Sequence, residues 1–248
     1  MILPRWEPQE ILAALPDVPR WVEARGMLLS GRCEIVSSGE SPGDVLLQAR
    51  SAPLIVVAGN PPLEPLAARA AQPGLGIVLC APEKGDEVRP LLEGWKRVGA
   101  AIHRLAGDDH PIAHGPPGYE IGILPEKDGS GRLGHLPQLL RDEISSALSG
   151  GHVAAAIKDA VPVSFCYPVW ETETLWDVSV DTLEPHRNRG LGAACAAFLI
   201  DHMRRHEKEA VWGAQEDNAP SLAVAANLGF TRVDRMTVFL RQPLLYPI

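Results

Sequence analysis

The sequence predicts an α/β protein built from two halves, each of which alternates short strands with helices. Three observations carry this prediction. The chain of 248 residues contains 46% hydrophobic residues, so it can bury one large core or two modest ones. Short apolar runs rich in valine, isoleucine and leucine alternate with segments of helical periodicity. The 23 prolines follow no repeating period, which excludes a collagen-like chain and a coiled coil.

The first half, residues 1–117, is predicted to be a smaller α/β domain. Helical segments within residues 4–29 are interrupted by Pro16 and Pro19, because proline lacks the amide hydrogen that a helix interior needs. Residues 108–118 are rich in charge, proline and glycine and mark the boundary of this half. The elements expected before that boundary are strands at 33–36, 45–48, 54–58 and 77–80 and helices at 63–71 and 87–98.

The second half, residues 118–248, is predicted to alternate strands and helices in the same way. A long helix is expected directly after a glycine-rich turn at 187–192. The order of elements in residues 54–105 recurs in residues 175–241, so an internal duplication is left open. The other elements expected are helices at 137–148 and 219–227 and strands at 152–158, 161–167, 175–183, 210–214 and 233–241.

Composition excludes several classes of partner. The net charge of −8 is spread over both halves, so binding to nucleic acid through phosphates is not expected. No window of about 18 apolar residues occurs and residues 1–8 do not resemble a secretory signal, so we expect a cytoplasmic protein without a membrane partner. The cysteines are scattered and fit neither a zinc ribbon nor a disulfide framework; they are Cys33, Cys80, Cys166 and Cys195.

The glycine-rich turn at residues 187–192, R-N-R-G-L-G, predicts an anion-binding site. The first amides of a helix have no intrahelical acceptor, and glycines let a ligand approach the backbone. Arg187 and Arg189 add charge that suits a pyrophosphate better than a single carboxylate. A dinucleotide-binding fingerprint would need a third glycine and a P-loop would need Gly-Lys-Ser or Gly-Lys-Thr, and both are missing. An ordinary tight turn with solvated arginines is left open.

The same turn resembles the acetyl-CoA motif of the GNAT superfamily of N-acetyltransferases. A second segment, N-A-P-S-L-A-V-A-A-N-L-G-F at residues 218–230, resembles the helix of that family that ends in Leu-Gly-Phe. The resemblance covers residues 153–240 and implies a GNAT-like acyltransferase fold with a mixed sheet in the C-terminal half. For the N-terminal half, a degenerate domain of the same kind and an unrelated α/β domain are both left open.

The resemblance also implies which residues bind acetyl-CoA. Backbone amides of the turn would hold the pyrophosphate, and the preceding strand would bind the acetyl and pantetheine amides at a point where two strands separate. One strand amide would stabilise the oxyanion. The cofactor-binding residues implied are Val180, Asp181, Thr182, Leu183, Arg187, Asn188, Arg189, Gly190, Leu191, Gly192, Ala193 and Asn218.

Acyl transfer to an amine needs a base, and the leaving thiolate needs an acid. Many family members have a tyrosine as acid where this chain has Ala225, so water or another residue must take that role. Strand alternation puts Asp177 and Asp181 on one face, and we favour Asp177 as the base with Glu173 in reserve. The alternative interpretation is that these acids are only solvated charges.

The sequence therefore predicts a GNAT-type acetyltransferase that transfers an acetyl group from acetyl-CoA to an amine directly, in a ternary complex. The acceptor is a small molecule or a peptide, and a homodimer is left open. The alternatives are a non-catalytic CoA-binding or regulatory module and a dinucleotide-binding protein. His202 and His206 have the spacing of a metal-binding pair, but no third ligand is evident, so no metal is expected.

Overall fold

The computed structural model describes residues 5–105, 115–126 and 130–241 and divides into two compact units. The first unit comprises Met1–Ile102, Gly213–Asn218 and Arg232–Ile248, and the second comprises His103–Trp212 and Ala219–Thr231. The predicted division of the chain between residues 117 and 118 stays a prediction.

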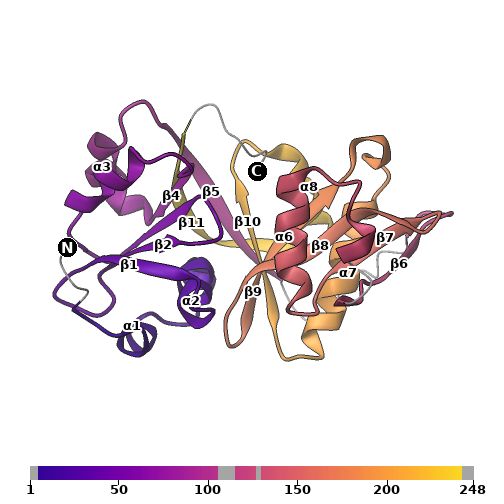
Figure 1. Ribbon diagram of the computed structural model, residues 1–248, viewed down its shortest axis with the longest axis horizontal. Helices are drawn as coiled ribbons and strands as arrows, with labels where there is room; N and C mark the ends of the chain where they lie inside the picture. The colour runs from indigo at the N-terminus through magenta and orange to yellow at the C-terminus, as the bar shows by residue number, and fades with distance from the viewer. Residues whose placement is uncertain (1–4, 106–114, 127–129, 242–248) are drawn as a thin grey trace. The chain divides into compact units, whose positions relative to one another are not determined.

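The first unit contains an antiparallel β-meander followed by a parallel strand (Figure 1). β1, β2 and β3 pair antiparallel in order, β4 runs parallel to β3, and Thr237–Leu240 of β11 pairs antiparallel with β4. Its strands are β1 (Cys33–Ser38), β2 (Val45–Ala49), β3 (Leu54–Ala58) and β4 (Ile77–Cys80). Its helices are α1 (Pro8–Ala14), α2 (Val22–Leu29), α3 (Glu64–Ala70) and α4 (Gly85–Val88), with 3₁₀ turns at Pro19–Trp21, Pro82–Lys84 and Arg89–Leu91.

The second unit has a similar order of pairing with one more antiparallel strand. β6 to β9 pair antiparallel in sequence order, and β10 runs parallel to β9. Its strands are β6 (Glu120–Ile123), β7 (Ala154–Lys158), β8 (Val161–Glu171) and β9 (Leu175–Thr182). Its helices are α6 (Gln138–Leu148), α7 (Leu191–Arg204) and α8 (Ala219–Asn227), with 3₁₀ turns at Ser130–Arg132 and Glu184–His186. The strands with residues in both units are β5 (Lys96–Leu105), β10 (Glu209–Gln215) and β11 (Phe230–Leu240).

Helices α6 and α7 cover the two faces of the sheet of the second unit. Alternate residues of β8 point to opposite faces, and Phe165 and Tyr167 join the core that Ile144 of α6 closes. On the other face, the thiol of Cys195 in α7 donates to the carbonyl oxygen of Ser164 at 3.7 Å. Both faces of β8 are therefore buried, which explains its nearly continuous apolar sequence.

The mixed α/β class and most expected elements are confirmed, and one helix is wrong. Residues 87–98 were expected to be helical, but the helix gives way to a 3₁₀ turn at Arg89–Leu91 and strand β5 begins at Lys96. Pro90 removes an amide donor, and Gly94 adopts φ +78, which ends the right-handed path. Among the described residues, no helix is long and apolar enough to cross a membrane.

Candidate active site

The turn between β9 and α7 presents backbone amides that the protein does not cap. The chain leaves β9 at Thr182 and enters α7 at Leu191, with Asn188 and Gly190 in left-handed conformations, φ +59 and +77. Gly190 is the N-cap residue of α7 and has no side chain with which to cap the helix. The first amides of the helix are therefore left for an anionic ligand.

Gly192 allows the start of α7 to lie against the end of β9. A Cβ atom at this position would lie 2.9 Å from Cγ1 of Val180 and 3.5 Å from Oγ1 of Thr182. The first of these distances is too short for ordinary packing, so a side chain would push the helix start away from the strand. The two glycines of the turn thus have different roles: Gly190 permits the backbone conformation, and Gly192 permits the close approach.

The two arginines of the turn are placed differently. Nε of Arg187 donates to the carbonyl oxygen of Thr182 at 3.0 Å, which holds its guanidinium at the end of β9. Arg189 is exposed one residue before Gly190. Both therefore add positive charge around the uncapped amides.

The parallel ladder between β9 and β10 ends before β9 does. Leu175 to Asp177 pair with Glu209 to Val211, and the last five residues of β9, from Val178 to Thr182, have no partner in this ladder. The alternation of the β8–β9 ladder decides which amides face that open edge. The amide of Leu183 donates to the carbonyl oxygen of Val163 in the segment that carries β8. Along a strand, successive amides point alternately to one side and the other. The amides of Val180 and Thr182 therefore point away from β8, toward the open edge.

The predicted catalytic carboxylates lie at different points along β9. Asp177 is half-buried and is the last residue of β9 that pairs with β10. Glu173 is exposed in the turn between β8 and β9, at the end of β9 opposite to α7. Ala225, at the position where the family has its tyrosine, is fully buried in α8 and carries no acidic hydrogen.

Asn218, the remaining predicted site residue, immediately precedes α8. Its amide donates to the carbonyl oxygen of Gln215 at 2.9 Å. Asn218 belongs to the first unit and the turn at 187–192 belongs to the second. Its predicted contact with the pantetheine arm therefore stays a prediction.

The structure also joins three acidic groups that the sequence did not connect. The hydroxyl of Tyr167 on β8 lies 2.8 Å from Oδ2 of Asp181 on β9 and 3.0 Å from Oε2 of Glu143 on α6. A phenol has one hydrogen, so it donates to one carboxylate at a time, and the other contact is favourable when that carboxyl is protonated. Only the strand register and the packing of α6 bring these residues together.

The pKa values of this cluster follow from its burial. Desolvation raises the pKa of Asp181, against the opposing effects of the Tyr167 hydroxyl and the Arg187 charge. The Glu143 residue is exposed, but its carboxyl group is partly desolvated, and this together with the charge of Asp181 raises its pKa. Burial and the two carboxylates raise the pKa of Tyr167. Tyr167 is therefore a poor proton donor, whereas each of the two carboxyls holds its proton to a higher pH than a solvated carboxyl does.

Comparison with known proteins identifies the part of the chain that contains this turn. Residues 146–239 match the family model described as GNAT acetyltransferase. Residues 146–239 are a GNAT acetyltransferase domain. The GNAT domain contains β8, β9, the turn and α7, so the acyltransferase predicted from the sequence is confirmed for this part of the chain.

Solved structures share the fold well beyond the GNAT domain. A GCN5-related N-acetyltransferase-like protein from Streptococcus suis has a TM-score of 0.70 at 16% identity, over 94% of this chain and 96% of its own. A GCN5-related N-acetyltransferase from Kribbella flavida has a TM-score of 0.60 at 15% identity, over 90% and 94%. A tandem GNAT protein from the clavulanic acid biosynthesis pathway has a TM-score of 0.50 at 16% identity, over 79% and 77%. No curated protein matches this chain.

Proposed function

We propose that the protein transfers the acetyl group of acetyl-CoA to an amine directly, within a ternary complex. The observation that carries this proposal is the early end of the β9–β10 ladder beside a turn of uncapped amides. Backbone donors on an open strand edge fit the amides of an extended ligand arm, and the turn fits the anionic end of the same ligand.

The turn is proposed to bind the pyrophosphate. The amides of residues 188–193 would donate to its oxygens, and the Arg187 and Arg189 guanidiniums would offset its charge. Acetyl-CoA supplies the thioester whose acetyl group is transferred. Val180 and Thr182 would bind the pantetheine arm, because their amides face the open edge of β9.

Asp177 is the base that this arrangement favours. It lies where the ladder opens, five residues of extended strand or ~17 Å before Thr182, so an arm that runs back along β9 ends near it. A carboxylate there can accept a proton from an ammonium group of the acceptor. Glu173 lies farther from the open edge and stays in reserve. An amide on the same edge would stabilise the oxyanion.

The first unit is proposed to be a half that repeats this topology without binding acetyl-CoA. Its meander of three strands followed by a parallel strand resembles the meander of four strands followed by a parallel strand in the second unit. The tandem GNAT protein of the clavulanic acid pathway supports the idea that two such halves occur in one chain. The unit would then offer a surface for a second copy of the chain.

Calorimetry and a thiol-release assay test the proposal together. Acetyl-CoA is expected to bind the full chain at one site with micromolar affinity, and free CoA thiol should appear when an accepted amine is added. The panel should contain amino acids, polyamines, aminoglycosides and peptides with free N-termini. Binding without thiol release across this panel would favour a non-catalytic CoA-binding module, and protection from thermal unfolding by NAD alone would favour the dinucleotide alternative.

Glycine variants test the proposed turn directly. The double variant Gly190→Val and Gly192→Val should weaken acetyl-CoA binding by at least about 100-fold, because it strains a left-handed residue and separates α7 from β9. Gly122→Ala in β6 is the matched control, since an added Cβ there has open space. Unchanged affinity in the double variant, with the control also unchanged, would contradict the proposal.

A further inference from the structure

Two histidines at the end of α7 have the spacing of a metal-binding pair. His202 lies in the last turn of the helix and His206 in the turn that follows, and their ring centroids are 4.9 Å apart. The sequence offers only these two ligands, which is why it predicted no metal. A pair of imidazoles leaves at least half of a four-coordinate shell to solvent and holds an ion weakly.

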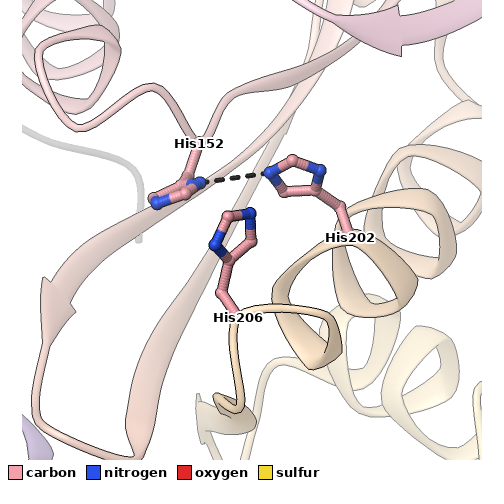
Figure 2. A group of neighbouring side chains, drawn as sticks. All are labelled: His152, His202 and His206. Atoms are coloured by element: carbon pink, nitrogen blue, oxygen red, sulfur yellow. Dashed lines mark hydrogen bonds between the residues drawn. The ribbon is translucent and has the colours of Figure 1, made fainter.

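The fold brings a third histidine, His152, to this pair (Figure 2). His152 lies just before β7, and its Nδ1 is 3.2 Å from Nε2 of His202. Its ring centroid lies 5.4 Å from that of His202 and 5.0 Å from that of His206. One ligand nitrogen from each histidine lies within 4.8 Å of the others. All three belong to the second unit, so the cluster is a property of that unit alone.

This spacing fits a tetrahedral transition-metal site. Bonds of about 2.0–2.1 Å from a zinc ion to imidazole nitrogens at tetrahedral angles place those nitrogens ~3.3 Å apart. The separation between His152 and His202 already has this value. A nitrogen of His206 lies within 4.8 Å of the other two, and this side chain is exposed.

Burial and charged neighbours act on two of the three histidines. Burial is the main cause that lowers the pKa of His152 and of His202, and the neighbouring histidines lower both further. The nearby carboxylates already have cationic partners: Glu171 pairs with Lys208 at 2.8 Å, and Asp201 pairs with Arg205. Neither carboxylate is therefore free to become a fourth ligand, and the three imidazoles are the donors that an ion would meet here.

We propose that His152, His202 and His206 bind one divalent transition-metal ion of the zinc class, with solvent in the fourth position. Three imidazoles without a thiolate or carboxylate suit zinc, copper, nickel and cobalt rather than magnesium or calcium. The ion joins the end of α7 to the start of β7. His202 lies about three turns along α7 from the proposed acetyl-CoA turn, or ~16 Å, so the site is separate from the acyl-transfer chemistry.

Zinc titration of the full chain tests this site. After removal of metals with EDTA, calorimetry should show one Zn²⁺ per chain with a Kd of about 1 µM or tighter. Excess zinc should raise the unfolding midpoint, because the ion binds the folded state. Cobalt should give the intense visible absorption of a four-coordinate ion, which reports the coordination geometry without relying on activity.

Variants distinguish a site with three histidine ligands from one formed by His202 and His206 alone. His152→Gln and His206→Gln should each weaken zinc binding by at least about 100-fold. His206 is exposed, so its replacement leaves the core intact, and circular dichroism in EDTA checks the fold of both variants. Asp201→Asn, next to His202, is the matched control and should bind zinc as the parent does. Unchanged affinity in His152→Gln, or the lack of saturable binding by the parent at about 1 mM zinc, would overturn the proposal.

Discussion

The two parallel strand–helix–strand segments of the protein follow the same path but end in different chemistry. In the second unit, β9 pairs with β10 over only three of its residues, Leu175 to Asp177, and the turn that follows has no side-chain cap. In the first unit, β3 pairs with β4 from Leu54 to Val57, along nearly its whole length. Backbone donors are therefore open in one segment and paired in the other.

The turn after β3 is also closed by the protein itself. The amide of Asn60 donates to Oδ1 of Asp44 at 2.7 Å, so a carboxylate of the chain occupies the place of an anionic ligand. Pro61 and Pro62 follow and have no amide hydrogens to offer. One topology thus supplies both an anion site and a closed turn, and the difference lies in a few residues at the strand end.

The strand residues differ in the same sense. β3 is buried and apolar throughout, from Leu54 to Ala58, whereas β9 carries Asp177 and Asp181 among its valines. A carboxylate beside the opening of a ladder is thus found only in the second of these two strands.

Replacement of the carboxylate at the opening should have the largest effect. Asp177→Asn keeps the shape of the side chain but cannot accept a proton, so kcat should fall by about 100- to 10,000-fold while acetyl-CoA affinity is retained. Steady-state thiol release with the best amine of the panel measures it. Asp201→Asn on the exposed side of α7 is the matched control.

The outcome also decides between the two predicted carboxylates. A large loss of kcat in Glu173→Gln, with Asp177→Asn close to the parent, would move the base to the β8–β9 turn. Equal retention of kcat in both variants would remove the base from β9 altogether.

Opening the closed turn of the first unit should cost stability without creating a second site. Asp44→Ala leaves the amide of Asn60 without its acceptor, so the free energy of unfolding should fall by about 1–3 kcal/mol. Asp86→Ala removes an exposed partner of Arg97 and should change it by less than about 1 kcal/mol. Urea unfolding measures both values. Calorimetry of Asp44→Ala should still give one acetyl-CoA per chain, because Pro61 and Pro62 have no amide hydrogens to offer a ligand. Binding of two acetyl-CoA molecules per chain would contradict this explanation.

The smallest effect expected is a pH dependence from the cluster of Asp181, Tyr167 and Glu143. The pKa values of both carboxyls are raised in the folded state, so the folded protein binds their protons more tightly than the unfolded chain. The stability that these protonated carboxyls add to the folded state is complete below the pKa values of the unfolded chain. It is lost as pH rises through the raised pKa values of the folded state. The free energy of unfolding of Asp181→Asn, relative to that of the parent, should therefore be higher at about pH 8 than at about pH 5.

Urea unfolding at both pH values measures this difference. Asp201→Asn, which replaces an exposed carboxylate of the same unit, is the control. An Asp181→Asn profile parallel to that of the parent would show that the cluster does not retain a proton.

Much of the second unit could be predicted because its signals are local. The residues from Arg187 to Gly192 follow a strand and open a helix, and this order alone places unpaired amides beside arginines. Local patterns fail where a proline and a left-handed glycine interrupt an apolar segment, as in the helix expected at 87–98. They also say nothing of register, so the link between Tyr167 and Asp181 could not be predicted.

The sequence by itself determined the alternation of strands and helices, the anion-binding turn and the resemblance to the GNAT superfamily, because each depends on residues close together in the chain. Only the tertiary structure decided where the β9–β10 ladder ends, which carboxyls share a hydroxyl, and that His152 lies beside His202. These contacts join residues far apart in the chain, and they form only when strand pairing and helix packing fix the positions of whole elements.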